Sequence, residues 1–219
     1  LPVLVTLQVD TEREASTGAR LLPALITLQS LGAAAVGLSG SNMEKLAEQM
    51  EEALPYAAVP LIASPQMPEE TLSPLAFGRK MEKVLDAGAT VVIGGRGVLP
   101  EHLAVVRGLL DRHPTVAAAE IDTEAAANER EAFFLGDHME FSEPLPCDSD
   151  LEDALIQAEE TSNCARVELA IPEDIPILLE ASSLSLLPIA VYTDDPHLLE
   201  SVLLRYPGRL IVDSLCEIP

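Results

Sequence analysis

The sequence predicts an α/β fold of the (β/α) TIM-barrel type, in which parallel strands alternate with helices. Short apolar runs of strand length alternate with longer segments whose apolar residues recur every three or four positions. Of the 219 residues, 48% are hydrophobic but only 3% are aromatic, so aliphatic side chains must fill the core. A high aliphatic content is typical of parallel strands that are buried on both faces. Repeated strand–helix units favour a parallel sheet with right-handed crossovers.

Four strand–helix pairs are expected in the first half of the chain. Gly32 follows the first helix at the position of a C-terminal cap, and the polar turn at residues 39–42 precedes the second helix. The expected strands are residues 4–9, 34–38, 59–63 and 89–93, and the expected helices are 20–31, 43–54, 72–85 and 100–110.

The pattern breaks after residue 112 and resumes at residue 132. Residues 123–130 are rich in Ala and Glu, so we expect a linking helix there, within a linker at 113–131. Residues 143–150 read as a loop rich in Pro and Asp. The other expected strands are 133–136, 166–170, 188–192 and 210–212, and the helices are 151–160, 173–182 and 197–205.

The strand count leaves two arrangements open. About four strands precede the linker and about four follow it, close to the number that closes a (β/α) barrel. Either the two halves close one combined barrel, or the chain is a hybrid of two half-barrels, each part of a larger one.

The charge of the chain argues against two classes of partner. There are 36 acidic and 13 basic residues, giving a net charge of −23. Nucleic-acid binding needs a Lys/Arg-rich surface, and anionic membranes attract basic segments, so neither partner is expected. No apolar run approaches the ~20 residues that span a bilayer.

The cysteines and the first residues indicate where the protein works. Cys147, Cys164 and Cys216 are odd in number and widely spaced, which argues against a disulfide framework and a structural zinc site. A reducing, cytoplasmic environment is therefore expected. The chain begins at Leu1 without a basic flank or a cleavage motif, which suggests the interior of a longer gene product or a processed chain.

Two groups of residues are candidates for ligand binding. Gly95, Arg96 and Gly97 lie between a strand and a helix, where a glycine turn can bind an anion or simply connect the two elements. Acidic residues also gather at or just after the strand ends of the second half, where they could bind a cation or serve only as helix caps and solvated groups. These are Asp137, Glu140, Glu168, Asp194, Asp195 and Asp213. No catalytic residue is assigned, because no base accompanies a nucleophile.

Taken in order, the segments resemble cobalamin-dependent methionine synthase across the junction of its two N-terminal modules. The first half resembles the end of the homocysteine S-methyltransferase barrel, and the second half resembles the start of the pterin-binding barrel. The first resemblance is carried by LGAAAVGL at 31–38, VPLI at 59–62, AGA at 87–89, IGG at 93–95 and PEH at 100–102. The second is carried by FLGD at 134–137, LPIAVYTDDP at 187–196 and YPGRLIVDS at 206–214.

The departures from that family bear on its chemistry. In the family three cysteine thiolates hold a zinc ion, and the matching positions here are Gly40, Arg96 and Gly97. Tyr192 and Asp213 also replace an Asp and an Asn of the pterin site. The resemblance therefore implies a degenerate active site with no metal, and it leaves open whether the chain is an enzyme. No resident cofactor is expected, and methyltetrahydrofolate or cobalamin would come only through a partner.

The resemblance assigns domains and a function. It implies a homocysteine S-methyltransferase-like half-barrel at 1–112, the linker at 113–131 and a pterin-binding-like half-barrel at 132–219. The expected role is binding or scaffolding in a methionine-synthase-related protein. A methyltransferase of altered chemistry and a fragment of a larger methionine synthase are the alternatives. The expected partners are a small-molecule ligand, a second copy of the chain or a corrinoid protein, and the expected ligand-binding residues are Gly95, Arg96, Gly97, Asp137 and Asp213.

Overall fold

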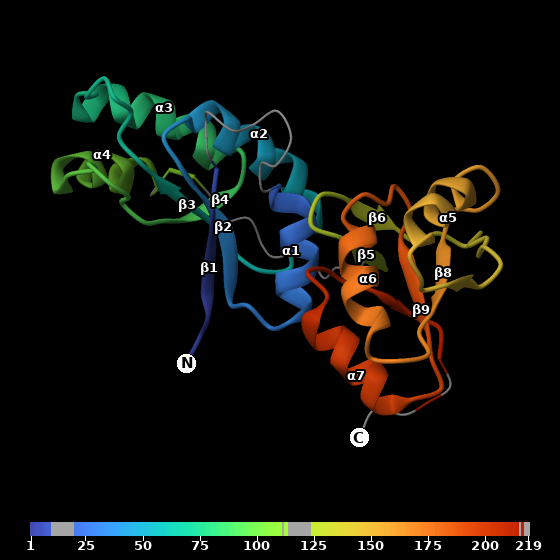
Figure 1. Ribbon diagram of the computed structural model, residues 1–219. Coiled ribbons are helices and arrows are strands. Elements are labelled where there is room, and N and C mark those ends of the chain that lie inside the picture. The colour runs from blue at the N-terminus through green and yellow to red at the C-terminus, as the bar shows by residue number, and fades with distance from the viewer. Residues whose placement is uncertain (10–19, 111, 114–123, 215, 217–219) are drawn as a thin grey trace. The chain divides into compact units, whose positions relative to one another are not determined.

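The computed structural model describes residues 1–9, 20–110, 112–113, 124–214 and 216. The chain divides into two compact units, Leu1–Asp122 and Thr123–Pro219. Figure 1 labels most of their helices and strands. Residues 114–123 of the predicted linker lie outside the described residues, and the domain boundaries stay a prediction.

The first unit contains a four-stranded parallel sheet in the order β1-β2-β3-β4. Neighbouring strands in this sheet are also consecutive in the chain, as they are in a (β/α) barrel. The strands are β1 (Leu4–Gln8), β2 (Ala35–Gly40), β3 (Leu61–Pro65) and β4 (Ala89–Val92). The helices are α1 (Leu21–Ser30), α2 (Met43–Ala53), α3 (Pro74–Asp86) and α4 (Pro100–Leu110), and a short 3₁₀ helix, η1, covers Leu54–Tyr56.

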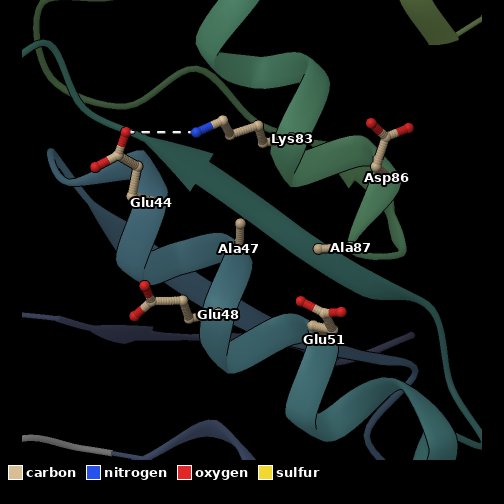
Figure 2. Close-up of a pocket in the computed structure, with 7 residues that line it drawn as sticks. All are labelled: Glu44, Ala47, Glu48, Glu51, Lys83, Asp86 and Ala87. Carbon is tan, nitrogen blue, oxygen red and sulfur yellow. Dashed lines mark ion pairs between the residues drawn. The ribbon is translucent and has the colours of Figure 1, made fainter.

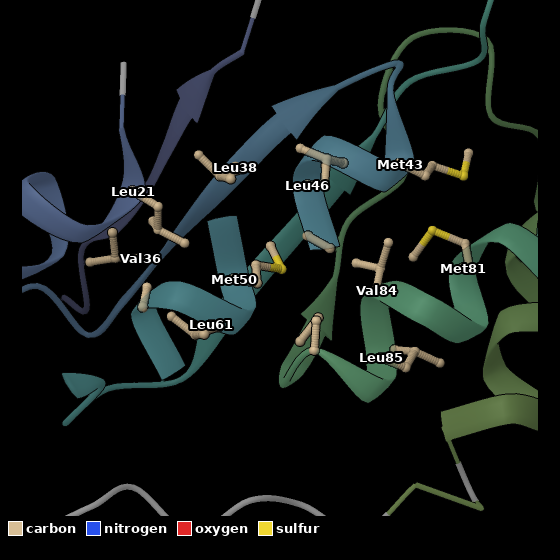
Figure 3. Packing of buried hydrophobic residues seen from close by; sticks show 14 of the residues in the cluster. Leu21, Val36, Leu38, Met43, Leu46, Met50, Leu61, Met81, Val84 and Leu85 are labelled. Atoms are coloured by element: carbon tan, nitrogen blue, oxygen red, sulfur yellow. The ribbon is translucent and has the colours of Figure 1, made fainter. Parts of the chain in front are cut away.

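The core of the first unit lies between the sheet and its helices. Leu38 of β2, Leu61 of β3, Met50 of α2 and Met81 of α3 are fully or almost fully buried in one apolar cluster. Figure 3 shows side chains from these elements directed into the space between them. Aliphatic and methionine side chains dominate the cluster, and Phe77 is its one fully buried aromatic residue among those described.

Side-chain caps fix where three helices begin. The Asn42 side chain accepts hydrogen bonds from the backbone N–H groups of Glu44 and Lys45, both 3.1 Å long, at the start of α2. Ser73 caps α3, and Asp195 caps α7. Such caps satisfy N–H groups that have no partner within the helix. The helix starts expected after residue 42 and at Asp195 are therefore confirmed.

The second unit contains a second four-stranded parallel sheet in the order β10-β9-β8-β7. Its apolar core is formed by one face of this sheet and by three helices. A separate antiparallel pair joins β5 (Ala125–Ala127) and β6 (Ala132–Phe134). The parallel strands are β7 (Leu145–Pro146), β8 (Ala165–Glu168), β9 (Ile189–Tyr192) and β10 (Ile211–Val212), and the helices are α5 (Leu151–Ala158), α6 (Asp174–Ser182) and α7 (Pro196–Arg205).

The predicted (β/α) barrel-type fold, with parallel strands alternating with helices, is confirmed in both units. Three local predictions differ from the structure. The linking helix expected at 123–130 is replaced by β5, whose three alanines are buried against β6. The strand expected at 133–136 lies in this antiparallel pair, and β7 supplies the fourth parallel strand from within the predicted loop at 143–150. A strand of two residues is too short to show an alternating pattern.

Asn128 holds the turn between β5 and β6. Its Oδ1 accepts hydrogen bonds from the N–H groups of Arg130, 2.8 Å, and Glu131, 2.7 Å. Its Nδ2 donates to the carbonyl oxygens of Ser182, 3.4 Å, and Ser185, 3.1 Å. The side chain is buried, so these bonds satisfy backbone groups at the end of α6 as well as in the turn.

Replacing Asn128 by Ala should destabilise the second unit by about 2–4 kcal/mol, because the substitution leaves several polar groups without partners. Urea unfolding followed by circular dichroism measures the change. Glu200→Ala, an exposed substitution on α7, is the control and should cost less than about 0.5 kcal/mol. Equal stability of the two variants would show that the Asn128 bonds contribute nothing.

The three cysteines differ in how accessible their thiols are. Cys147 and Cys164 are buried in the second unit, and Cys216 is partly exposed. Burial, with the nearby charge of Asp174, raises the pKa of Cys147 to about 12. Burial is also the main cause that raises the pKa of Cys164 to about 11. A thiol must ionise to react as a nucleophile, so both buried groups are protected.

A thiol reagent such as DTNB should therefore modify one cysteine per folded chain, Cys216, and all three in urea. The Cys216→Ser variant should show no fast reaction when folded. Rapid modification of two or three thiols in the folded protein would contradict the burial of Cys147 and Cys164.

Candidate functional site

The carboxyl edge of the first sheet carries a small polar network. Gln66, just after β3, donates from Nε2 to Gln8 Oε1, 3.0 Å, and to Ser39 Oγ, 3.1 Å. Its backbone N–H donates to the carbonyl oxygen of Gly40, 2.8 Å. The network thus joins the ends of three neighbouring strands and uses the amide of Gln66 for that purpose.

The glycine turn after β4 packs closely against the segment after β3. The N–H of Gly95 donates to Pro65 O, 2.9 Å, and the N–H of Met67 donates to Arg96 O, 2.8 Å. A Cβ atom on Gly95 would lie 2.7 Å from Pro65 O, and Gly97 has φ +79°. These glycines are therefore required by backbone packing and conformation.

The expected anion site at this turn stays a prediction, but it now depends on fewer groups. The Gly95 N–H is already occupied by Pro65, which leaves the Arg96 side chain and Gly97 to receive a ligand. Arg96 is exposed, and its side chain has no protein partner in the described part of the chain. An unsupported arginine on the surface gains little from a single anion because water screens the interaction.

His102, near the start of α4, has a structural role. It is buried, its Nδ1 accepts from the N–H of Leu99, 3.1 Å, and its Nε2 lies 3.0 Å from Leu72 O. The ring also contacts Phe77 edge-on, with the centroids 5.2 Å apart. Because Nδ1 is an acceptor, the proton must be on Nε2, and both nitrogens are occupied.

The second sheet brings charged residues together on the face opposite its helices. Val167 and Val191 point into the helix-covered core, so their neighbours along each strand point the other way. In the register of the sheet, Glu168 lies opposite Tyr192, and Arg166 lies opposite Ala190. Asp213 follows β10, and its N–H continues the ladder to the carbonyl oxygen of Val191.

Arg166 reaches from β8 across β9 to the end of β10. Its Nε lies 2.7 Å from Asp213 Oδ2, and its Cζ lies 4.7 Å from the centroid of the Tyr192 ring. The small side chain of Ala190 leaves room for this crossing. Nε is buried but its N–H is not aligned for a hydrogen bond, so the contact with Asp213 is an ion pair. An ion pair and a cation–π contact thus hold the guanidinium group.

Tyr192 connects this pair to a further carboxylate. Its hydroxyl group donates to the Asp194 carboxylate, 3.3 Å to Oδ1 and 3.4 Å to Oδ2. The negative charge of Asp194 is the main cause that raises the pKa of Tyr192; Glu168 adds to the shift, and Arg166 opposes it. We call Arg166, Glu168, Tyr192, Asp194 and Asp213 the Arg166 cluster.

The Arg166 cluster includes only part of the acidic group expected from the sequence. Asp213, Asp194 and Glu168 belong to it, whereas Asp195 caps α7. Asp137 follows β6, which pairs with β5 and does not belong to the parallel sheet. Sequence reasoning missed Arg166, although it is the one basic residue within the four parallel strands of this unit.

A separate acidic groove lies between α2 and α3 of the first unit. Its volume is about 570 Å³, and Figure 2 shows the residues that line it, Glu44, Ala47, Glu48, Glu51, Lys83, Asp86 and Ala87. Lys83 Nζ lies 3.6 Å from Glu44 Oε1, and both side chains are 67% exposed. Four carboxylates and one ammonium give the groove a charge of −3, which solvation on the helix surface is enough to explain.

The described residues contain no group of three or more His, Cys, Asp or Glu side chains arranged to hold a metal ion.

Among the helices of the described residues, none has the length and apolar character needed to cross a membrane.

Comparison with known proteins gives similarity to solved structures alone. No family model matches the chain, and no curated protein matches it. The tryptophan synthase alpha chain of Legionella pneumophila is 12% identical with a TM-score of 0.37; the match covers 96% of this chain and 79% of that one. The tryptophan synthase complex of Pyrococcus furiosus is 11% identical with a TM-score of 0.34, and the match covers 96% of this chain and 86% of that one. A Burkholderia cenocepacia protein named as a phosphonomutase is 16% identical with a TM-score of 0.36, and the match covers 97% of this chain and 86% of that one. Similarity this loose assigns neither a substrate nor a reaction.

The expected relationship to cobalamin-dependent methionine synthase is wrong. No family model or curated protein supports it, and the structures named above are tryptophan synthase and phosphonomutase proteins. The matched stretches are short strand ends and glycine turns, which recur in many βα repeats. The functions expected from this relationship are therefore also wrong. They were a methionine-synthase-related scaffold, a methyltransferase of altered chemistry and a fragment of methionine synthase. The methyltetrahydrofolate, cobalamin and corrinoid-protein expectations lose their basis.

Proposed function

We propose that this chain binds a small molecule through a carboxylate or similar planar anionic group, and that Arg166 receives that group. The observation that carries the proposal is the fixed guanidinium of Arg166, held between Asp213 and the Tyr192 ring. An arginine that is oriented before binding loses less conformational freedom when the ligand arrives.

The guanidinium retains donors for a ligand. It has five N–H groups in a planar fork, and its ion pair with Asp213 is 2.7 Å long at Nε. Its terminal nitrogens have no protein partner among the residues that the structure describes. Two parallel N–H groups match the two oxygens of a carboxylate, which a lysine cannot reproduce. The side chain is 30% exposed, so a small molecule can reach it.

The position of the cluster also supports ligand binding. Arg166, Glu168 and Tyr192 lie in the last three positions of their strands, and Asp213 lies just beyond β10. Ligands of open and closed parallel α/β sheets bind at this carboxyl edge. A purely structural ion pair at this exposure would contribute about 0–1 kcal/mol to stability.

Titration of the ¹⁵N-labelled chain with sodium acetate tests the proposal, with sodium chloride as the ionic-strength control. Acetate should shift the backbone amide resonances of residues 166–168 and 192–194 with a saturating curve. Arg166→Gln should abolish these shifts, and Arg166→Lys should weaken binding at least fivefold, because the charge remains and the fork is lost.

Two further arginine variants locate the site. Arg79→Gln, on the exposed surface of α3, should leave acetate binding unchanged. Arg96→Gln tests the turn expected from the sequence. Acetate shifts that persist in Arg166→Gln, or that disappear only in Arg96→Gln, would overturn the proposal.

A further inference from the structure

We infer that the ligand of the Arg166 cluster is a zwitterion, in which an ammonium group accompanies the carboxylate that Arg166 receives. This inference rests on the proposed function and names the class of ligand. An amino acid is the simplest molecule of that class.

The charges of the cluster do not balance without a ligand cation. Arg166 is paired with Asp213 at 2.7 Å, so one positive and one negative charge offset each other. Glu168 and Asp194 remain, and neither forms an ion pair with any described residue. An incoming carboxylate alone would therefore add a third uncompensated negative charge to the site.

The two remaining carboxylates lie near the Tyr192 ring, over which the guanidinium group lies. Glu168 lies two residues after Arg166 on the same face of β8, and it lies opposite Tyr192 in the register of the sheet. Asp194 lies beyond β9 and is hydrogen-bonded to the hydroxyl group of Tyr192. A ligand whose carboxylate binds Arg166 therefore has both of these carboxylates nearby to receive its ammonium group.

A short flexible amino acid can bring its two charged groups to these residues. Both carboxylates are at exposed residues, so they can adjust to the ammonium group. The whole chain carries a net charge of −23, which further opposes a ligand with negative charge alone. A zwitterion has no net charge and avoids that penalty.

Matched probes distinguish a zwitterion from a simple anion. 4-Aminobutanoate carries both groups, whereas 4-acetamidobutanoate keeps the carboxylate and loses the positive charge. NMR titration of the full chain should show that 4-aminobutanoate binds at least fivefold more tightly. The double variant Glu168→Gln/Asp194→Asn should remove this preference, while the control Glu200→Gln should keep it.

The outcomes distinguish failure of the zwitterion inference from failure of the proposed carboxylate site. Equal affinities for the two probes would overturn the zwitterion and leave the carboxylate site on Arg166 intact. A preference that persists in the double variant would also overturn it, because the ammonium group would be recognised elsewhere. If neither probe shifts the resonances of the cluster, the proposed function fails together with the inference.

Discussion

The register of β8, β9 and β10 determines which side chains meet on the free face of the second sheet. It places Ala190 beside Arg166 and Tyr192 beside Glu168. Ala190 ends at Cβ, so the arginine can cross the middle strand and meet Asp213. A larger residue at position 190 would block that path, and the guanidinium would lose both Asp213 and its place against the Tyr192 ring.

The two carboxyl edges use their polar groups differently. In the first unit the backbone N–H groups of Gln66, Gly95 and Met67 already donate to carbonyl oxygens of Gly40, Pro65 and Arg96, and the Gln66 side chain donates to Gln8 and Ser39. That edge is internally satisfied, and Arg96 projects from it without support. In the second unit Arg166 is held by an ion pair that is not aligned as a hydrogen bond, so its N–H groups remain available, and the Asp194 carboxylate accepts from Tyr192. The second edge therefore has more capacity to bind a ligand.

Much of the fold could be predicted from the sequence because parallel strands and amphipathic helices have different periods. The helix that α4 forms was expected at its observed bounds, and the start at Asp195 followed from capping chemistry. The antiparallel pair could not be predicted, since its three alanines favour a helix over a strand. Their burial against β6 decides the outcome.

Only part of the candidate site could be predicted from the sequence. Carboxylates at strand ends were recognised because any parallel sheet gathers its strand ends at one edge. Arg166 was missed because its role depends on the cross-strand register and on the size of Ala190. Short glycine-rich stretches also suggested a relationship that the comparisons overturned, since such stretches reflect βα geometry more than ancestry.

The most direct measurement of the central claim is the mobility of the Arg166 side chain in the chain without ligand. Side-chain ¹⁵N relaxation at Nε should give Arg166 an order parameter near that of rigid backbone, about 0.85, and a much lower value for the exposed Arg79. Asp213→Asn should increase the motion of Arg166. If Arg166 is as mobile as Arg79 in the unmodified protein, the guanidinium is not held in place, and the account of the cluster as a prepared binding site is wrong.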